Sequence, residues 1–305
     1  MDSLSTASAD SMYILDASTR ELLIESAPLM EEWSTTHCAG KDMGGMEEWA
    51  KTQNAQPVES CDWYHGTWQY LRLLNMVAVP PWYEFYQEAL SNVLRQRPNA
   101  EVLISAAADY GMLATLHDAI RATGATPRIQ VYDICRTPLR ACQWYAERHG
   151  LTIECVCANL ITGDIPPASF DLIVTDEFLT VIKSSDKPLI VKRWRELLKP
   201  GGTLVTTAMV GGSTTPELRQ GYADRAHRLF EDHTDSFPQH LNGGRDGLLD
   251  RFNLFASHHT RHMLSGEEEI RQLFDGFGTV SYVETLTPGE CVNPTASFQV
   301  VATVP

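Results

Sequence analysis

Apolar and polar positions alternate in a regular order from about residue 101 onward. Short apolar runs, which are typical of buried strands, are separated by longer segments that have the residue spacing of helices. The predicted strands are 102–105, 128–132, 152–156, 170–175, 203–207, 280–285 and 298–303; the predicted helices are 112–123, 138–149, 188–198 and 266–274, with a turn at 199–202. This order predicts an α/β fold with a mostly parallel, seven-stranded sheet and helices on both of its faces.

The pattern also predicts how the chain is divided. Residues 1–98 are irregular and partly helical, and we expect them to form an N-terminal cap or lid over a sheet domain at 99–305. A polar stretch at about 211–262 is predicted to be an insertion that holds one or two helices. Only a loop joins 280–285 to 298–303, so these two strands should pair antiparallel as a C-terminal hairpin.

The amino-acid composition limits which classes of partner we expect for the protein. The chain has 24 Lys and Arg against 39 Asp and Glu, a formal charge of −15. A surface this acidic repels nucleic-acid backbones, so no nucleic-acid partner is expected. The seven cysteines form no CxxC pair, which favours a reducing cytoplasm and predicts no zinc or other metal site. We find no leader peptide and no apolar run of membrane length, so we expect a cytoplasmic protein without a membrane partner.

The segment Val102–Gly111, of sequence VLISAAADYG, joins a strand end to a helix start through very small residues. Such a connection brings a ligand close to the backbone. Ala106 and Ala108 stand where glycine is usual, and their methyl groups restrict positive φ. We therefore expect either ordinary φ values at both residues or a ligand that lies slightly further from the loop. The strand that ends in Asp133 begins roughly 20 residues later, the spacing of a ribose-binding carboxylate. The alternative is that Asp133 caps the helix that follows it.

Five motifs together resemble the class I S-adenosylmethionine (SAM)-dependent methyltransferases. In chain order they are VLISAAADYG, VYD ending at Asp133, ANL at 158–160, FDLIVTD at 170–176 and LLKPGGTLV at 197–205. The resemblance is good over about residues 100–210 and looser to 304. It implies a Rossmann-like methyltransferase sheet and SAM as the cofactor. An NAD-type site is disfavoured because GxGxxG is absent.

The resemblance also implies which residues bind SAM. The loop after the first strand would pass beneath the methionine part and the ribose, and Asp133 would hold the ribose diol. Asn159 would accept a hydrogen bond from the adenine amino group. The full predicted set is Ser105, Ala106, Ala107, Ala108, Tyr110, Asp133, Ile134, Asn159, Leu160, Thr175 and Asp176. Asp176 would contact the SAM ammonium or orient a substrate; the alternative is an ion pair with a nearby Lys or Arg.

An aromatic segment before the sheet is the predicted lid. Its members are Trp63, Tyr64, Trp68, Trp82, Tyr83 and Tyr86. Aromatic faces attract the SAM sulfonium, although most aromatic residues at helical spacing belong to the core, so we expect two or three to line the site. Tyr64, Trp68 and Asp176 are the catalytic candidates. For the histidines of the HHTRH run at 258–262, a surface or substrate-facing role is favoured over metal binding.

Three functions are compatible with these features. The first is methyl transfer from SAM to a small molecule by in-line displacement, with water excluded by the lid. The second is cyclisation of SAM to azetidine-2-carboxylate with release of methylthioadenosine, a reaction that some enzymes of this fold perform. The third is an inactive SAM-binding protein. A role in small-molecule or secondary metabolism fits the first two, and a homodimer is left open.

Overall fold

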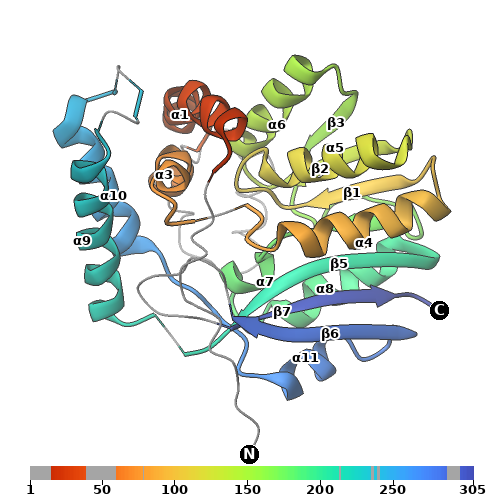
Figure 1. Ribbon diagram of the computed structural model, residues 1–305. Helices are drawn as coiled ribbons and strands as arrows, with labels where there is room; N and C mark the ends of the chain where they lie inside the picture. The colour runs from red at the N-terminus through yellow and green to blue at the C-terminus, as the bar shows by residue number, and fades with distance from the viewer. Residues whose placement is uncertain are drawn as a thin grey trace, which may run out of the picture.

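The computed structural model, drawn in Figure 1, describes residues 15–38, 60–77, 79–212, 214–234, 237–238, 241–286 and 296–305. Its centre is a seven-stranded sheet with the order β3-β2-β1-β4-β5-β7-β6. The strands are β1 (Glu101–Ser105), β2 (Arg128–Asp133), β3 (Ile153–Cys157), β4 (Phe170–Val174), β5 (Leu198–Val210), β6 (Thr279–Leu286) and β7 (Ala296–Thr303). β1 to β5 pair in parallel, whereas β7 is antiparallel to both β5 and β6. The predicted α/β fold, with a mostly parallel seven-stranded sheet and an antiparallel C-terminal pair, is confirmed.

Helices cover both faces of the sheet (Figure 1). The described helices are α1 (Ala17–His37), α3 (Asp62–Leu73), α4 (Tyr83–Gln96), α5 (Gly111–Thr123), α6 (Arg136–His149), α7 (Phe178–Val181), α8 (Lys187–Leu197), α9 (Pro216–Asp232), α10 (Gly244–His258) and α11 (Glu267–Leu273). α5 and α6 end at Gly124 and Gly150, whose φ values near +70° are those of glycine helix caps.

Two hydrophobic cores, one on each face, hold the layers together. Val102 and Ile104 of β1 face the core that contains α1, α4, α5 and α6, whereas Leu103 faces the core beneath α8 and α11. Neighbouring side chains of a strand point to opposite faces, so a strand buried on both sides has to be apolar throughout. This explains why Val102–Ile104 of β1 is an apolar run and why β4 is nearly unbroken, with Asp171 as its one polar residue.

The turn predicted at 199–202 lies inside β5 instead. Leu198 pairs with Phe170 and Thr203 with Leu172, so the register shifts between these two pairs. The extra residues form an irregularity in the strand, where Gly201 takes a φ of +70°. A bulge of this kind lets a strand continue past residues that the sequence pattern marks as a turn.

Four helices that do not belong to the alternating strand–helix pattern, α1, α3, α9 and α10, pack together beside the sheet. α1 packs against α3 and α6, and α10 packs against both α3 and α9; in Figure 1 the α9–α10 pair stands beside α1 and α3. Leu23 of α1, Tyr70 of α3 and Phe252 of α10 belong to the same core as β1. In the described residues, the insertion contains α9 and α10, and α10 packs against the N-terminal helix α3. The domain boundary at 98/99 stays a prediction.

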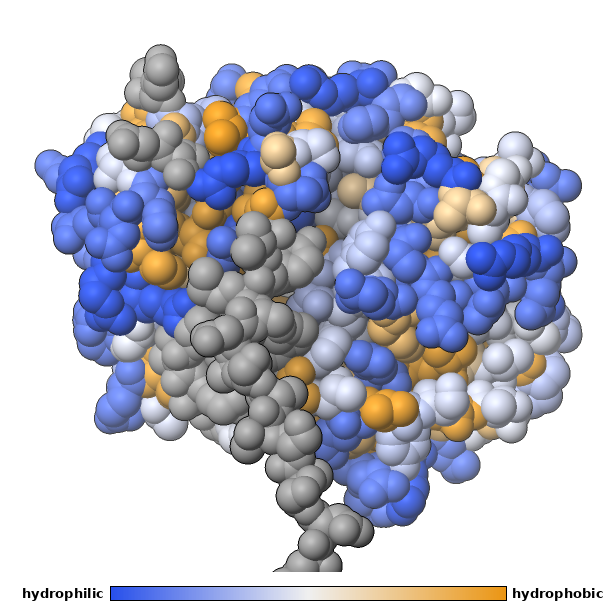
Figure 2. Space-filling model, in the orientation of Figure 1, coloured by the Kyte–Doolittle hydropathy of each residue, from blue (hydrophilic) through white to orange (hydrophobic). Residues whose placement is uncertain are grey.

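The face drawn in Figure 2 is mainly hydrophilic, with scattered hydrophobic residues between the polar ones. The large apolar side chains most exposed in the described residues are Val181, Leu189, Leu254, Val283 and Leu286. Within the same residues, none of the helices has the length and apolar character needed to cross a bilayer.

Candidate SAM site at the ends of β1, β2 and β4

The strand order reverses direction beside β1. From β1 the chain runs outward to β2 and β3, and it then returns to β4 and β5 on the other side of β1. In open α/β sheets, the crevice beyond the carboxyl ends of the strands at such a switch point is where ligands bind. The ends of β1, β2 and β4 and the loops after them carry most of the residues predicted for SAM, whereas Asn159 and Leu160 follow β3.

The loop after β1 adopts a strained backbone. Ala106 has a φ of +66°, so the expectation of ordinary φ values is wrong at this residue. Its amide donates a hydrogen bond of 2.8 Å to the carbonyl of Tyr132 in the neighbouring β2. The left-handed region costs a residue with a Cβ about 1–2 kcal/mol, which the surrounding contacts offset. The loop therefore turns as a glycine loop does although it carries an alanine.

Asp133 links two of these loops through its carboxylate. Oδ2 accepts a hydrogen bond of 3.0 Å from the amide of Ala107, and Oδ1 accepts one of 2.7 Å from the amide of Cys135. A carboxylate has about four acceptor positions, so two remain for a diol. Burial raises the pKa of Asp133 to about 6. Asp133 is not the N-cap residue of α6, which is Cys135, but its bond to the Cys135 amide lies at the start of that helix, so the ribose and helix-start roles both stay predictions.

Asp176 and Glu177 form a pair of adjacent carboxylates just beyond β4. Asp176 Oδ1 accepts hydrogen bonds from Thr207 at 2.9 Å and Tyr86 at 3.2 Å. Burial, followed by the neighbouring charge of Glu177, holds the pKa of Asp176 well above its usual range. Among the described residues no Lys or Arg forms an ion pair with Asp176, so its observed partners are hydroxyl groups.

An aromatic stack faces these acids. Tyr64 of α3 stacks on Trp68 at 4.8 Å between ring centroids and on Phe255 of α10 at 5.6 Å. Burial and then the charges of acidic residues, Asp133 and Asp176 among them, raise the pKa of Tyr64. The Tyr64 phenol is therefore within electrostatic range of the strand ends. Tyr64 and Trp68 each keep part of their surface exposed.

His259, from the HHTRH run, extends the same stack. Its ring stacks on Phe255 at 4.8 Å, and its Nε2 accepts a hydrogen bond of 3.2 Å from Arg261. Burial and the positive charges of Arg261 and Arg219 lower its pKa to about 3. The imidazole is therefore neutral at physiological pH. Phe255 and His259 were not among the predicted site residues, because they come from the insertion rather than from a methyltransferase motif.

Other predicted residues have partners within the protein. The hydroxyl of Ser105 is buried and accepts a hydrogen bond of 2.8 Å from the indole of Trp194. Tyr110 is 1% exposed and stacks on Tyr145 at 5.2 Å, and these contacts explain its burial without a ligand. Asn159 Oδ1 accepts the amide of Ile161 at 2.9 Å, which leaves a lone pair for a second donor.

The remaining predicted residues include both buried and partly accessible side chains. Leu160 is 8% exposed within the core below α8, and Ile134 keeps part of its surface accessible. Ala107 and Ala108 are also partly accessible in the β1 loop. Of the aromatic pool, Tyr86 is fully buried, and Tyr83 donates a hydrogen bond of 3.0 Å to Asp118. The SAM-binding and catalytic roles of all these residues stay predictions.

A buried ion pair, which no sequence motif predicts, connects α3 to the β1 loop. Arg72 and Asp109 lie 2.5 Å apart, with side chains 4% and 0% exposed. Asp109 Oδ1 also accepts the amide of Gly111 at 2.7 Å. The pair connects the helix that carries Tyr64 and Trp68 to the loop at the sheet edge, so it fixes the distance between the aromatic stack and the strand ends.

The residues around the switch point suit a polar, cationic ligand. Among the described residues, the buried Thr175 Oγ1 and Trp68 Nε1 have no hydrogen-bond partner. A buried polar group without a partner costs about 1–3 kcal/mol, which a ligand can recover. The carboxylates of Asp133 and Asp176 and the Tyr64–Trp68 stack supply acceptors for a diol and an attractive environment for a sulfonium.

Comparison with protein-family models identifies the class of domain. Residues 108–202 match the family model of a methyltransferase domain, which spans less than half of the chain. SAM is the cofactor that this domain implies. No curated protein matches the chain.

Solved structures similar to the chain share little sequence with it. The PH0226 protein from Pyrococcus horikoshii OT3 is 14% identical with a TM-score of 0.47, over 78% of this chain and 99% of that one. A SAM-dependent methyltransferase from Methanosarcina mazei is 18% identical with a TM-score of 0.44, over 68% and 93%. A protein from Bordetella parapertussis described as exported is 17% identical with a TM-score of 0.46, over 73% and 67%.

Proposed function

For a chain that carries a SAM-dependent methyltransferase domain over residues 108–202, we propose that the protein methylates a small molecule at the carboxyl ends of β1 and β4. The observation that supports this most is the convergence of Asp133, Asp176 and the Tyr64–Trp68 stack at the switch point. Bound SAM would supply the methyl group: the acceptor atom would bond to the methyl carbon in line with the breaking C–S bond, and S-adenosylhomocysteine would leave.

Asp133 is the proposed ribose ligand. Its two remaining acceptor positions suit the two hydroxyls of a diol, and the amides of Ala107 and Cys135 hold its carboxylate in place. Hydrogen bonds to a charged group contribute about 1.5–3 kcal/mol each, so two of them supply a large part of the affinity. The partly exposed Ala107, Ala108 and Ile134 lie close enough in the chain to line the same part of the site.

Tyr64 and Trp68 are the proposed aromatic cover. A cation over an aromatic face gains about 0.5–2 kcal/mol, more where water is excluded. The stack is braced by Phe255 of α10 and held near the sheet by the Arg72–Asp109 pair. Its main role is therefore to hold the sulfonium and to exclude water, so that alignment of the reacting atoms provides much of the catalysis.

Asp176 is the proposed base for acceptors that must lose a proton. Its pKa is raised by burial and by Glu177, and a carboxylate with a raised pKa takes up a proton more readily near neutral pH. Thr207 and Tyr86 fix the orientation of Oδ1. Replacing Asp176 with Asn should lower kcat strongly and weaken SAM binding only modestly, because the proton acceptor is lost together with one of several groups that attract the sulfonium.

Product analysis tests the proposal. The protein is incubated with methyl-labelled SAM, first alone and then with pooled small-molecule acceptors, and the nucleoside products are separated. Methyl transfer predicts S-adenosylhomocysteine and a labelled acceptor only in the second mixture. Methylthioadenosine formed from SAM alone would replace the proposal with the cyclisation alternative, in which the SAM amino group displaces the thioether. Binding without either product would indicate an inactive SAM-binding protein.

A further inference from the structure

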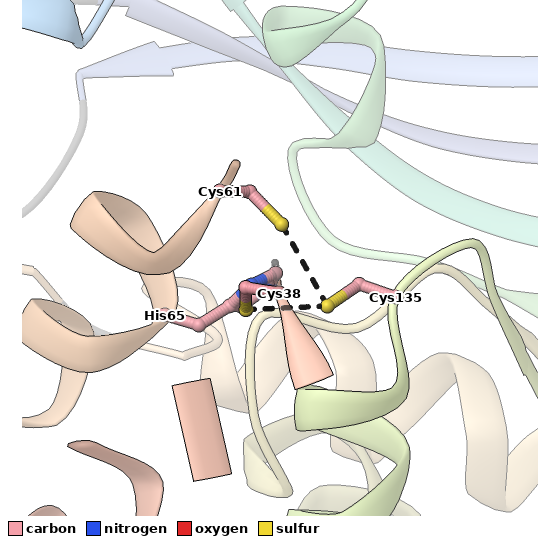
Figure 3. A group of neighbouring side chains, drawn as sticks. All are labelled: Cys38, Cys61, His65 and Cys135. Atoms are coloured by element: carbon pink, nitrogen blue, oxygen red, sulfur yellow. Dashed lines mark hydrogen bonds between the residues drawn. The ribbon is translucent and has the colours of Figure 1, made fainter. Parts of the chain in front are cut away.

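Three cysteines and one histidine meet beside the proposed SAM site (Figure 3). They are Cys38, Cys61, His65 and Cys135, and one potential ligand atom from each lies within 4.8 Å of all the others. Cys38, His65 and Cys135 are buried, and Cys61 is partly exposed. The side chains point toward one another from three separate parts of the chain. Neither the proposed SAM contacts nor the methyl transfer uses this cluster.

Three distances between the ligand atoms are close to those of a tetrahedral metal site, and the remaining ones are no longer than 4.8 Å. Zn–S bonds of about 2.3 Å at tetrahedral angles place two sulfurs about 3.8 Å apart, and Zn–N bonds of about 2.0 Å place a sulfur and a nitrogen about 3.5 Å apart. Cys135 Sγ lies 3.5 Å from Cys38 Sγ and 3.7 Å from Cys61 Sγ. Cys38 Sγ lies 3.4 Å from His65 Nδ1. A disulfide would need about 2.05 Å between sulfurs.

The surroundings are those of a supported site. Thr137 Oγ1 lies 3.0 Å from Cys38 Sγ, and its hydroxyl can donate a hydrogen bond to a thiolate. Ser60 donates a hydrogen bond of 2.9 Å to the carbonyl of Cys38. The Cys135 amide donates to Asp133, the proposed ribose ligand. Hydrogen bonds of this kind orient the groups around a metal and tune its affinity.

We propose that Cys38, Cys61, His65 and Cys135 bind one Zn²⁺ ion in a closed, structural site. Three thiolates and one imidazole are the ligands that zinc takes in structural centres. On binding, three thiols release three protons and form Zn–S bonds, and the neutral His65 forms a Zn–N bond. The product carries one net negative charge. Four protein ligands leave no position for water, so the ion has a structural rather than a catalytic role.

The position of the ion explains what it would do for the fold. Cys38 is the C-cap of α1, Cys61 is the N-cap of α3, and Cys135 is the N-cap of α6 directly after β2. The ion therefore joins two N-terminal helices to the loop that carries Asp133. Loss of the metal should loosen the aromatic helix α3 from the sheet edge and weaken SAM binding as a secondary effect.

Metal analysis of the full chain tests the site directly. The wild-type protein, Cys61→Ser and Cys155→Ser are expressed with zinc and purified under reducing conditions, and metals are measured per chain. Cys61 is chosen because it is the most exposed ligand. Cys155 is a matched control that lies outside the cluster, where its thiol donates a hydrogen bond of 3.6 Å to the carbonyl of Leu139. We expect one zinc in the wild type and in Cys155→Ser, and an affinity at least about tenfold lower in Cys61→Ser.

Cobalt provides a readout that does not depend on stability. The wild-type protein, stripped with a chelator and checked by circular dichroism, is titrated with Co²⁺. A tetrahedral Cys₃His site gives thiolate-to-cobalt charge-transfer bands and intense visible bands at one ion per chain, and these should weaken in Cys61→Ser. Thr137→Val should lower the affinity for the ion about 10–100-fold without removing a ligand.

Several results would overturn the proposal. These are no zinc and no cobalt bands in the folded wild-type chain, iron in place of zinc, or equal metal content and affinity in Cys61→Ser and the wild type. A Cys38–Cys135 disulfide in protein kept under reducing conditions, found by alkylation and mass spectrometry, would also overturn it. None of these results bears on methyl transfer, so the two proposals fail independently.

Discussion

The Arg72–Asp109 ion pair offers a quantitative test of how the aromatic helix is held over the sheet. Both side chains are almost completely buried and their nearest charged atoms lie 2.5 Å apart. Removing one partner leaves the other charge buried without its opposite charge, which costs about 3–5 kcal/mol. Arg72→Met should therefore lower the free energy of unfolding by about that amount, and Asp109→Asn should do the same.

The double variant separates pairing from packing. Arg72→Met/Asp109→Asn removes both charges, so it should be more stable than the sum of the two single losses predicts, with a coupling of about 0.5–3 kcal/mol. The exposed pair Arg148–Glu25, with side chains 46% and 44% exposed, is the control. Arg148→Met should cost at most about 1 kcal/mol.

Urea unfolding followed by circular dichroism gives these free energies. If the Arg72→Met loss were no larger than that of Arg148→Met, the burial argument would be refuted. If the single losses simply added in the double variant, the two charges would not be coupled. A parallel SAM titration should show weaker binding in both single variants, because α3 and the β1 loop would no longer be fixed relative to each other.

Three further predictions concern Asp133, Ala106 and His259. The pKa of Asp133 is about 6, and a diol binds the ionised carboxylate better. SAM affinity measured by calorimetry should therefore fall as the pH drops through 6, approaching tenfold per pH unit. An affinity that does not change with pH would contradict the ribose role. Ala106→Gly should change the free energy of unfolding by less than about 1 kcal/mol, because relief of the left-handed strain offsets the entropy of glycine, whereas Ala106→Val should destabilise clearly. The pKa of His259 is lowered to about 3, so its ring signals in NMR should show no titration between pH 8 and about 4; a midpoint near the ordinary value for histidine would disprove its burial in the stack.

The sheet and the position of Asp133 could be predicted because both depend on local patterns. β1 and β4 are buried on both faces, so their apolar runs are nearly unbroken, and Asp133 is the last residue of β2. The φ of Ala106 could not be predicted in the same way. It depends on contacts with another strand, including the hydrogen bond from the Ala106 amide to the carbonyl of Tyr132. These contacts cannot be inferred from the residues of the loop.

The parts of the site that were missed come from distant segments. Phe255 and His259 reach the aromatic stack from the insertion, and Arg72 reaches Asp109 from 37 residues away. The cysteine cluster joins residues that are 27, 74 and 97 positions apart. The absence of a CxxC pair led to the expectation of no metal site, and that spacing argument does not cover ligands assembled by the fold.

The most direct test of the central claim is a calorimetric titration of SAM into the wild type, Asp133→Asn and Glu154→Gln. Glu154 lies on β3, where its side chain accepts a hydrogen bond of 2.9 Å from Gln130, so Glu154→Gln is a control for the loss of one charge near the sheet edge. A SAM site at the ends of these strands predicts one binding site per chain, a SAM affinity at least about tenfold lower in Asp133→Asn, and little change in SAM affinity in Glu154→Gln. Equal affinity in all three proteins, or no binding in the wild type, would contradict a SAM site at the ends of β1, β2 and β4.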